Sequence, residues 1–147
     1  MKSTPAPEDL MQHPGHLMRR SVQVLNTLWA EEVSRTITSP QFAALNALYA
    51  EPDLDQRTLG ERISLDRSTM AEIVSRLAAR GLIRSERHPV DARKKAIALT
   101  PKGRQTIRQL IPRTRAMTAR LVGPLDPHQR EQLLCLLTSV VRANERV

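Results

Sequence analysis

Residues 57–100 constrain the fold of this 147-residue chain more than any other segment does. Apolar residues at helical spacing predict a short helix over about 56–63, and Asp55 stands before it as an N-cap candidate. A second helix over about 67–80 has its apolar residues at i, i+3, i+4 and i+7, on one narrow face. Gly81 then stands where helices commonly end in a left-handed residue.

A basic hairpin is predicted after the two helices. Residues 82–87 predict one strand, and residues 95–99, in which apolar and polar side chains alternate, predict its partner. The connection, residues 88–94, is too long for a two-residue turn and is expected to project as a flexible loop. Two short helices followed by a hairpin are typical of a winged helix-turn-helix, which places a helix in the major groove of DNA. We therefore predict a mainly α fold with a small β-hairpin wing.

The charge of this segment favours a polyanionic partner over a merely solvated surface. Ten Lys and Arg residues and five Asp and Glu residues lie between Arg57 and Lys95, so this stretch carries five of the eight net positive charges. A membrane surface is the competing polyanion, but no predicted helix combines a basic face with large aromatic residues. With one Trp, one Tyr and one Phe, the chain also lacks the stacking residues that single-stranded nucleic acids need. Double-stranded DNA is the predicted partner.

The predicted DNA contacts fall on the start of the second helix and on the hairpin. Arg67 and its neighbours are expected to meet base edges in the major groove, because short polar groups and arginines suit them. Arg93 is expected to enter the minor groove. Arg76 is expected to meet a phosphate or the acids of a partner subunit, and Asp91 either pairs with a neighbouring basic side chain or is solvated. The full predicted set is Arg67, Ser68, Thr69, Arg76, Arg87, Arg93, Lys94 and Lys95.

Further helices are expected around this unit, over residues 14–34, 39–50, 101–121 and from 127 onward. In the last three, proline follows a Ser, Thr or Asp cap, which is a common helix start. Pro112 is expected to kink the long third helix, because proline removes a backbone donor and clashes with the preceding turn. The residues expected to face the core are Leu17, Val24, Leu25 and Leu28 in the first helix and Phe42, Leu45 and Leu48 in the second.

The last helix is apolar on more than one face, and a terminal helix of this kind usually packs against another chain. Its apolar residues are Leu133, Leu134, Leu136, Leu137, Val140 and Val141. Cys135 lies among them and is interpreted as a small buried hydrophobic residue. As the one cysteine of the chain, it excludes an internal disulfide.

The hairpin and the helix before it resemble those of the MarR family of bacterial transcriptional regulators. The similarity rests on Gly81-Leu82-Ile83-Arg84, Asp91-Ala92-Arg93, Ile97-Ala98-Leu99-Thr100 and Gly103, and on the helix text LDRSTMAEIVSRLAARGLI. It extends from about Pro14 to Val141. The resemblance implies a homodimeric, mostly helical repressor that releases DNA when a small ligand binds. It makes the redox-sensing branch of the family doubtful here, because the chain has no cysteine near its N-terminus.

The resemblance also implies that the first helix joins the last one in a dimer interface. The predicted organisation is a disordered tail over 1–9, dimerisation helices over 10–36 and 101–147, and a winged unit over 37–100, all in one intertwined domain. Two winged units related by a two-fold axis would read an inverted repeat with half-site centres about 10 bp apart.

An effector site is implied between the dimerisation helices and the winged unit. The text HPGHLMRR, residues 13–20, resembles a subgroup that controls aromatic-acid catabolism. A hydroxylated benzoate, a hydroxynicotinate or an aromatic acyl thioester is therefore the expected ligand. The predicted effector-binding residues are His13, His16, Arg20, Trp29, Phe42 and Tyr49. The competing interpretation makes Trp29 a core residue and the two histidines capping or solvated residues.

Other classes of function lack their motifs. The chain has no Gly-x-Ser-x-Gly elbow, no HExxH and no phosphate-binding glycine loop, so no catalytic residue is predicted. His13 and His16 have metal-ligand spacing but no third ligand nearby, so no metal or cofactor is predicted. No apolar run approaches 18 residues, and a cytoplasmic, nucleoid-associated protein is expected. A ligand-independent architectural DNA-binding protein and an activator on the same fold stay open as alternatives.

Overall fold

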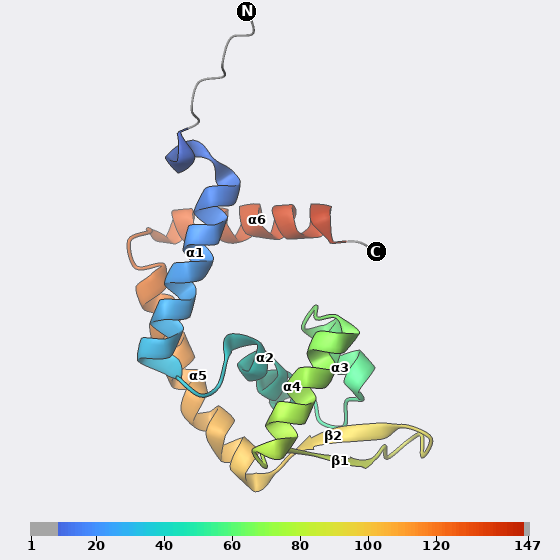
Figure 1. Cartoon of the computed structure of the whole chain (residues 1–147). Coiled ribbons are helices and arrows are strands. Elements are labelled where there is room, and N and C mark those ends of the chain that lie inside the picture. The colour runs from blue at the N-terminus through green and yellow to red at the C-terminus, as the bar shows by residue number, and fades with distance from the viewer. Residues whose placement is uncertain (1–8, 146–147) are drawn as a thin grey trace, which may run out of the picture.

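The computed structural model describes residues 9–145, in which two strands lie among helices (Figure 1). In chain order the elements are the 3-10 turn η1 (Leu10–Gln12), α1 (Pro14–Leu28), the π-helical turn η2 (Trp29–Val33), α2 (Ser39–Ala50), α3 (Gln56–Arg62), α4 (Arg67–Ala79), β1 (Ile83–Arg87), β2 (Lys95–Leu99), α5 (Pro101–Leu121) and α6 (Pro127–Asn144). The predicted disordered tail lies outside the described residues except at Asp9, whose carboxylate caps η1.

Helix α4 ends as its sequence predicts. Gly81 has a φ of 68° and follows the C-cap residue, so it takes the left-handed position that favours glycine. The Gly81 N–H donates to the Ala78 carbonyl at 2.9 Å, and the Leu82 N–H donates to the Leu77 carbonyl at 3.0 Å. This pair of bonds satisfies carbonyls that a helix end leaves open, and it turns the chain directly into β1.

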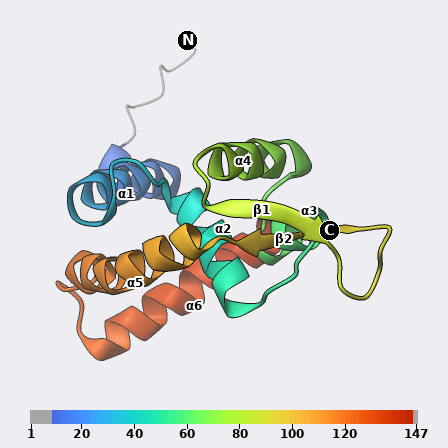
Figure 2. The same cartoon turned by 90° about the horizontal axis from the view of Figure 1, so that it is seen from below.

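The wing is a two-stranded antiparallel hairpin in which Ile83 lies opposite Leu99 and Arg87 lies opposite Lys95. Its base is extended by Leu54, whose carbonyl accepts a hydrogen bond from the Ile97 N–H at 2.8 Å. The loop at its tip projects beyond the helices (Figure 1, Figure 2). The predicted winged helix-turn-helix with a small hairpin is confirmed.

The core lies where α2, α4, the wing and α5 meet. Leu45, Leu59, Leu77 and Ile107 are each 0% exposed, so one residue from each of four helices is fully removed from water. Leu45 and Leu48 face this core as predicted, and Phe42 is half-buried at its edge. Burial of aliphatic side chains from segments this far apart in sequence is the main force that joins the winged unit to α5.

The first helix departs from its prediction. Helix α1 ends at Leu28, and the next five residues form a π-helical turn, in which the Ser34 N–H donates to the Trp29 carbonyl at 2.9 Å. Leu17 is 39% exposed and Val24 is 46% exposed. The prediction that these two residues face the core is therefore wrong for the single chain. The other two, Leu25 and Leu28, pack against the edge of the core.

Helix α6 buries no residue within the chain. Leu134, Leu136 and Val141 are more than half exposed, at 67%, 65% and 51%. Cys135 is exposed as well, so its interpretation as a buried residue is wrong for the single chain, because α6 buries none of its residues against its own chain. Pro112 lies inside α5, which is nevertheless continuous from Pro101 to Leu121.

We predict that Gly103→Ala destabilises the fold. A Cβ added at Gly103 would lie 2.0 Å from the Leu82 carbonyl oxygen, which the fold holds in place. The expected loss is about 1–3 kcal/mol of the free energy of unfolding, as for other overpacked sites. Thermal or urea denaturation measures it, with Gly15→Ala as control, because a Cβ there meets only the His13 ring at 3.4 Å. Equal stability of the two variants would contradict the steric argument.

Candidate DNA interface and effector cleft

The start of α4 is held by a carboxylate. Asp66 Oδ1 accepts the Thr69 N–H at 2.9 Å and the Ser68 hydroxyl at 2.6 Å, and Asp66 Oδ2 accepts the Thr69 hydroxyl at 2.6 Å. Both hydroxyl protons are therefore directed to Asp66. The Ser68 and Thr69 hydroxyl oxygens can therefore accept further hydrogen bonds but cannot donate any. They suit the amino groups on base edges better than they suit phosphate oxygens.

The same contacts keep Asp66 ionised. Hydrogen bonds from the Ser68 hydroxyl and then from Thr69 hold the pKa of this carboxyl well below its usual value of 3.8. Asp66 is exposed, as is its neighbour in sequence, Arg67. A formal anion at the start of the helix also interacts favourably with the helix dipole.

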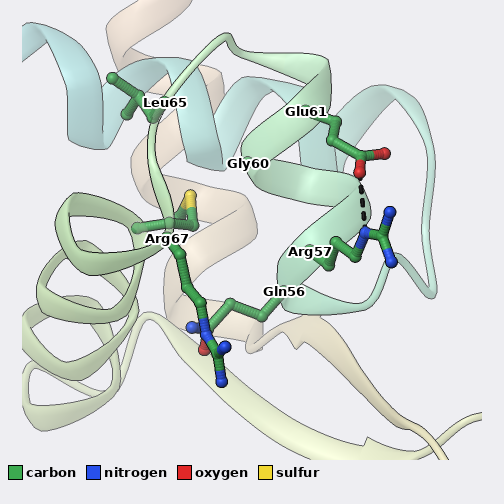
Figure 3. A pocket seen from close by; sticks show the side chains of 7 residues that line it. Gln56, Arg57, Gly60, Glu61, Leu65 and Arg67 are labelled. Carbon is green, nitrogen blue, oxygen red and sulfur yellow. Dashed lines mark hydrogen bonds and ion pairs between the residues drawn. The ribbon is translucent and has the colours of Figure 1, made fainter.

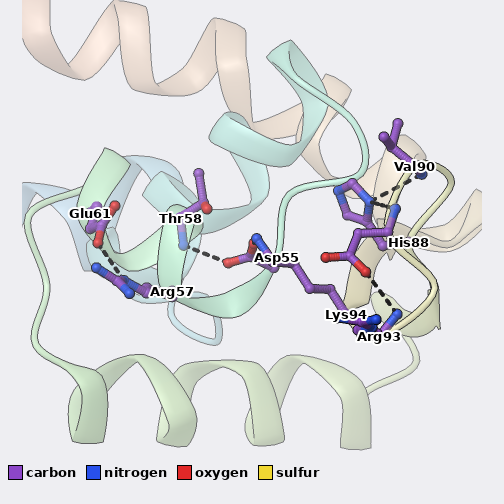
Figure 4. Close-up of polar contacts among 9 residues, drawn as sticks. Asp55, Arg57, Thr58, Glu61, His88, Val90, Arg93 and Lys94 are labelled. Atoms are coloured by element: carbon purple, nitrogen blue, oxygen red, sulfur yellow. Dashed lines mark hydrogen bonds and ion pairs between the residues drawn. The ribbon is translucent and has the colours of Figure 1, made fainter.

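Polar contacts within the tip of the wing fix the position of Arg93 (Figure 4). The His88 Nδ1 accepts the backbone N–H groups of Val90 at 3.2 Å and Asp91 at 3.1 Å. The Asp91 carboxylate in turn accepts the Arg93 N–H at 3.0 Å. Asp91 was expected to hold the loop by pairing with a basic side chain; it holds it through the backbone instead, which leaves the Arg93 side chain exposed.

The other predicted DNA contacts differ in their surroundings. Arg87 and Lys95 face each other across the hairpin as two exposed like charges, an arrangement that costs energy unless an anion approaches. Arg76 pairs with Glu72 one turn earlier on α4, so the acid it meets belongs to its own chain. Lys94 lies 3.6 Å from the Asp55 carboxylate.

A hollow between α3 and α4 brings further polar residues to this face (Figure 3). Gln56 from α3 and Arg67 from α4 point toward each other, while Arg57 turns aside and pairs with Glu61 at 2.8 Å. Neither Gln56 nor Arg57 was predicted from the sequence. Their position in the first turn of α3, directly after the Asp55 cap, was the signal that could have found them.

A second hollow, a cleft of about 540 Å³, lies between α1, α2, α3 and α5. Trp29 and Phe42 form one wall, with ring centroids 5.4 Å apart in an edge-to-face arrangement. Leu25, Ile63 and Met117 add apolar surface, and the lining is completed by Ser39, Ala43, Asn46, Ala47, Arg62, Thr114 and Thr118. An apolar cleft with a few polar groups suits a small organic ligand.

A neighbouring groove of about 500 Å³ continues this cleft along α5. It shares Phe42, Asn46, Thr114 and Thr118 with the cleft and adds Arg115 and Arg130. None of these polar residues was predicted from the sequence. They gather because α2 packs beside α5 and α6 begins nearby, and no local pattern in the sequence indicates that arrangement.

The predicted effector residues are only partly brought together. Trp29 and Phe42 line the cleft, and Trp29 is also a core residue at 6% exposure. The Tyr49 hydroxyl accepts a hydrogen bond from Arg108 Nε at 3.3 Å and does not line the cleft. The remaining three, His13, His16 and Arg20, lie at the start of α1, where Arg20 lines a separate hollow and His16 pairs with Arg19.

The wall of the cleft is connected to α4 by polar contacts. The Trp29 indole N–H donates to the Ile37 carbonyl at 2.6 Å in a buried hydrogen bond. The preceding residue, Thr36, accepts hydrogen bonds from the Arg80 guanidinium at its carbonyl and, at 3.3 Å, at its hydroxyl. Arg80 is the C-cap of α4, so one short segment is bound to both the aromatic wall and the helix of the DNA face.

Two other findings concern the described residues alone. Over residues 9–145 no three His, Cys, Asp or Glu side chains gather as a metal site would require. None of the helices in this range is both long and apolar enough to span a membrane.

Comparison with known proteins identifies the family. Residues 37–95 match the model of the MarR family. The transcriptional repressor NicR from Pseudomonas putida is 30% identical over 140 residues, which cover 95% of this chain and 89% of NicR. The chain belongs to the MarR family. The resemblance in the sequence analysis is thereby confirmed, and the relatives it matches are transcriptional regulators.

Solved structures of this family agree with the fold. The PcaV regulator from Streptomyces coelicolor, in complex with its natural ligand, is 47% identical and superposes with a TM-score of 0.90, covering 96% of this chain and all of PcaV (100%). BpsR from Bordetella bronchiseptica, whose DNA binding is regulated by 6-hydroxynicotinic acid, is 28% identical with a TM-score of 0.76, covering 86% of this chain and 96% of BpsR.

We predict that the Asp66 cap matters for stability in a pH-dependent way. Because folding lowers the pKa of Asp66 below 3.8, its contribution is complete above that pH and is lost as the pH falls through the lowered value. Asp66→Ala removes the cap, whereas Asp66→Asn keeps an acceptor for the Thr69 N–H. Thermal unfolding between pH 3 and 7 should rank wild type, Asn and Ala variants in falling order, with the gap narrowing in acid. A gap that widens in acid would refute the assignment.

Proposed function

We propose that this MarR-family protein is a homodimeric repressor that binds an inverted-repeat operator in double-stranded DNA and is released by a small aromatic or heteroaromatic acid, or its thioester. The observation that carries the proposal is the spatial relation of the exposed cations on α4 and the wing to an aromatic-walled cleft on the other side of α2. Such a regulator would act on the chromosome in the cytoplasm.

The DNA-reading role is assigned to the start of α4 and the tip of the wing. Arg67 is exposed in the first turn of α4, where a guanidinium can bind a guanine edge with two hydrogen bonds. Ser68 and Thr69 accept hydrogen bonds from base amino groups, as their contacts with Asp66 dictate. Arg93 enters the minor groove, and Arg87 and Lys95 meet phosphates on either side of it.

The dimer is supported by the apolar surface that the single chain leaves uncovered. Leu134, Leu136, Leu137 and Val141 on α6 are all exposed, and so are several large apolar residues on η1 and α1. A group of exposed large apolar residues commonly marks a contact between proteins. A second copy seated there would cover both the α1 and α6 faces, and it would set the spacing of the two winged units.

The effector is assigned to the cleft behind Trp29 and Phe42. BpsR is regulated by 6-hydroxynicotinic acid, and this supports a ring of similar size here. Arg62 or Arg115 would bind the carboxylate, and Asn46, Thr114 or Thr118 a ring hydroxyl or nitrogen. The predicted contacts from His13, His16 and Arg20 require the partner chain to bring the start of its α1 to this cleft.

Release follows from the contacts between the cleft and α4. A ligand that moves Trp29 acts on the Ile37 carbonyl and on the adjoining Thr36, to which Arg80 of α4 is bound. A shift of about 1–3 kcal/mol in DNA affinity is typical of such coupling. The ligand can change the affinity by no more than the difference in its own affinity for the two conformations.

We predict that Arg67 and Arg93 can be told apart on DNA. With an operator selected from random duplexes, Arg67→Ala should lose about 1–3 kcal/mol of discrimination against a scrambled duplex. Arg93→Ala should weaken binding to both duplexes and reduce the salt slope by about one. Titrations at several salt concentrations measure both. Equal losses on the two duplexes for Arg67→Ala would exclude its base-reading role. A wild-type footprint that coats DNA uniformly would favour an architectural protein.

We predict that an aromatic acid found by thermal-shift screening releases the operator through the cleft. Phe42→Ala should weaken ligand binding about 10- to 100-fold, because it removes one aromatic wall of the cleft, and should leave operator binding intact. Tyr49→Phe is the matched control, since Tyr49 lies outside the cleft. Loss of ligand binding in Tyr49→Phe but not in Phe42→Ala would move the site to Tyr49. A ligand that stabilises the protein while DNA stays bound would contradict release.

A further inference from the structure

One carboxylate joins the loop of the wing to the start of α3. Asp55 Oδ1 accepts the Thr58 N–H at 2.8 Å and caps α3. Asp55 Oδ2 lies 3.6 Å from Lys94 Nζ, and Figure 4 shows the Lys94 side chain extending from the wing to Asp55. The Asp55 side chain is only 18% exposed. Most of the Asp55 side chain is therefore shielded from solvent, and its carboxylate lies beside Lys94 of the wing.

The backbone of Lys94 is also a junction of the wing. Its N–H donates to the Asp91 carbonyl at 3.0 Å, and its carbonyl accepts the His88 N–H at 3.1 Å. These bonds close the loop that carries Arg93. On the Asp55 side of the ion pair, the preceding residue, Leu54, is hydrogen-bonded to Ile97 of β2. The backbones beside Asp55 and at Lys94 are therefore both fixed to the same edge of the winged unit.

We propose that Asp55 is a positioning residue for DNA binding, whose carboxylate binds Lys94 and so sets the direction in which the wing presents Arg93. This proposal rests on the proposed DNA-binding function and changes the role of Lys94. Lys94 was predicted to contact DNA; here its ammonium group is held by its own chain. The hydrogen bond from Thr58 chiefly, with a contribution from Lys94, lowers the pKa of Asp55, so the carboxylate is ionised at neutral pH.

The proposal predicts an unusual direction for the effect of a neutralised carboxylate on DNA binding. A carboxylate close to DNA ordinarily opposes binding, so its neutralisation should strengthen binding. If Asp55 positions the wing, neutralisation should instead weaken binding. A lysine that meets a phosphate releases a counterion, and its removal lowers the salt slope by about one, whereas a lysine held by Asp55 leaves the slope unchanged.

Asp55→Asn and Lys94→Gln test the proposal in the full-length protein on an operator duplex. Asn keeps an acceptor for the Thr58 N–H and removes only the charge. Each variant should bind about two- to fivefold more weakly, which is the range of a partly exposed ion pair, with an unchanged salt slope. The double variant should bind no more weakly than either single one, because the two residues act through one contact.

Asp53→Asn is the matched control. It removes the same charge two residues away, at a left-handed residue (φ 65°) that asparagine tolerates. Unchanged or tighter binding for Asp53→Asn beside weaker binding for Asp55→Asn supports the proposal. Tighter or unchanged binding for Asp55→Asn overturns it, and so does a Lys94→Gln variant whose salt slope falls by about one while Asp55→Asn has no effect.

Hydrogen exchange separates this proposal from the proposed function, because it needs no DNA. In the free protein, Asp55→Asn and Lys94→Gln should both speed exchange of the His88 and Lys94 amides, while Asp53→Asn should not. Faster exchange in a protein that fails to bind any duplex would refute the function and keep the ion pair. Unchanged exchange together with normal operator binding would refute the role of Asp55.

Discussion

The arrangement of the molecule depends on one junction, where α4 ends, the wing begins and ends, and α5 starts. The Thr100 hydroxyl donates to the Gly81 carbonyl at 2.6 Å and accepts the Gly103 N–H at 3.0 Å, while the Thr100 N–H donates to the Leu82 carbonyl at 3.1 Å. A single threonine thus caps α5 and binds both residues that follow α4. This geometry also requires the Gly103 backbone to lie so close to the Leu82 carbonyl that no Cβ fits between them. These hydrogen bonds connect the start of α5 directly to the end of α4 and to the wing.

Local patterns predicted the winged unit because its ends are marked by local chemistry. Asp55 and Gly81 each act within four residues of their own position, so their roles could be predicted from short sequence windows. The Asp66 cap of α4 acts over the same short range but was not predicted. The outward faces of α1 and α6 were not predicted for the single chain, since an apolar pattern reports that a face avoids water but not which chain covers it. The π-helical turn after Leu28 and the polar lining of the cleft depend on tertiary packing, which no spacing of residues reports.

The cations at the start of α3, on α4 and on the wing divide into two groups, those paired with acids and those that are not. A count of charges does not distinguish the two groups. Four of them are held by acids of the same chain, in the pairs Arg57–Glu61, Arg76–Glu72, Arg84–Glu86 and Lys94–Asp55. Within the described residues, Arg67, Arg87, Arg93 and Lys95 have no such ion pair. Only cations that exchange counterions for phosphate contribute to the salt dependence of binding. In the function we propose, the unpaired cations would bind phosphate, and the paired ones would be held by their own chain.

In the regulator that we propose, the position of Trp29 connects the cleft to α4 without any contact between ligand and DNA. Its ring is part of the cleft wall and of the core, and its N–H is bound to the segment that also holds Arg80. An indole that is buried on one side and hydrogen-bonded on the other can move only if its neighbours move with it, since close-packed interiors transmit strain. A π-helical turn at this residue leaves the helix one hydrogen-bond register away from an ordinary α-helix, and such turns occur often at functional sites. The aromatic wall and α4 are therefore connected, and in the function we propose a ligand bound at this wall would act on DNA binding through that connection.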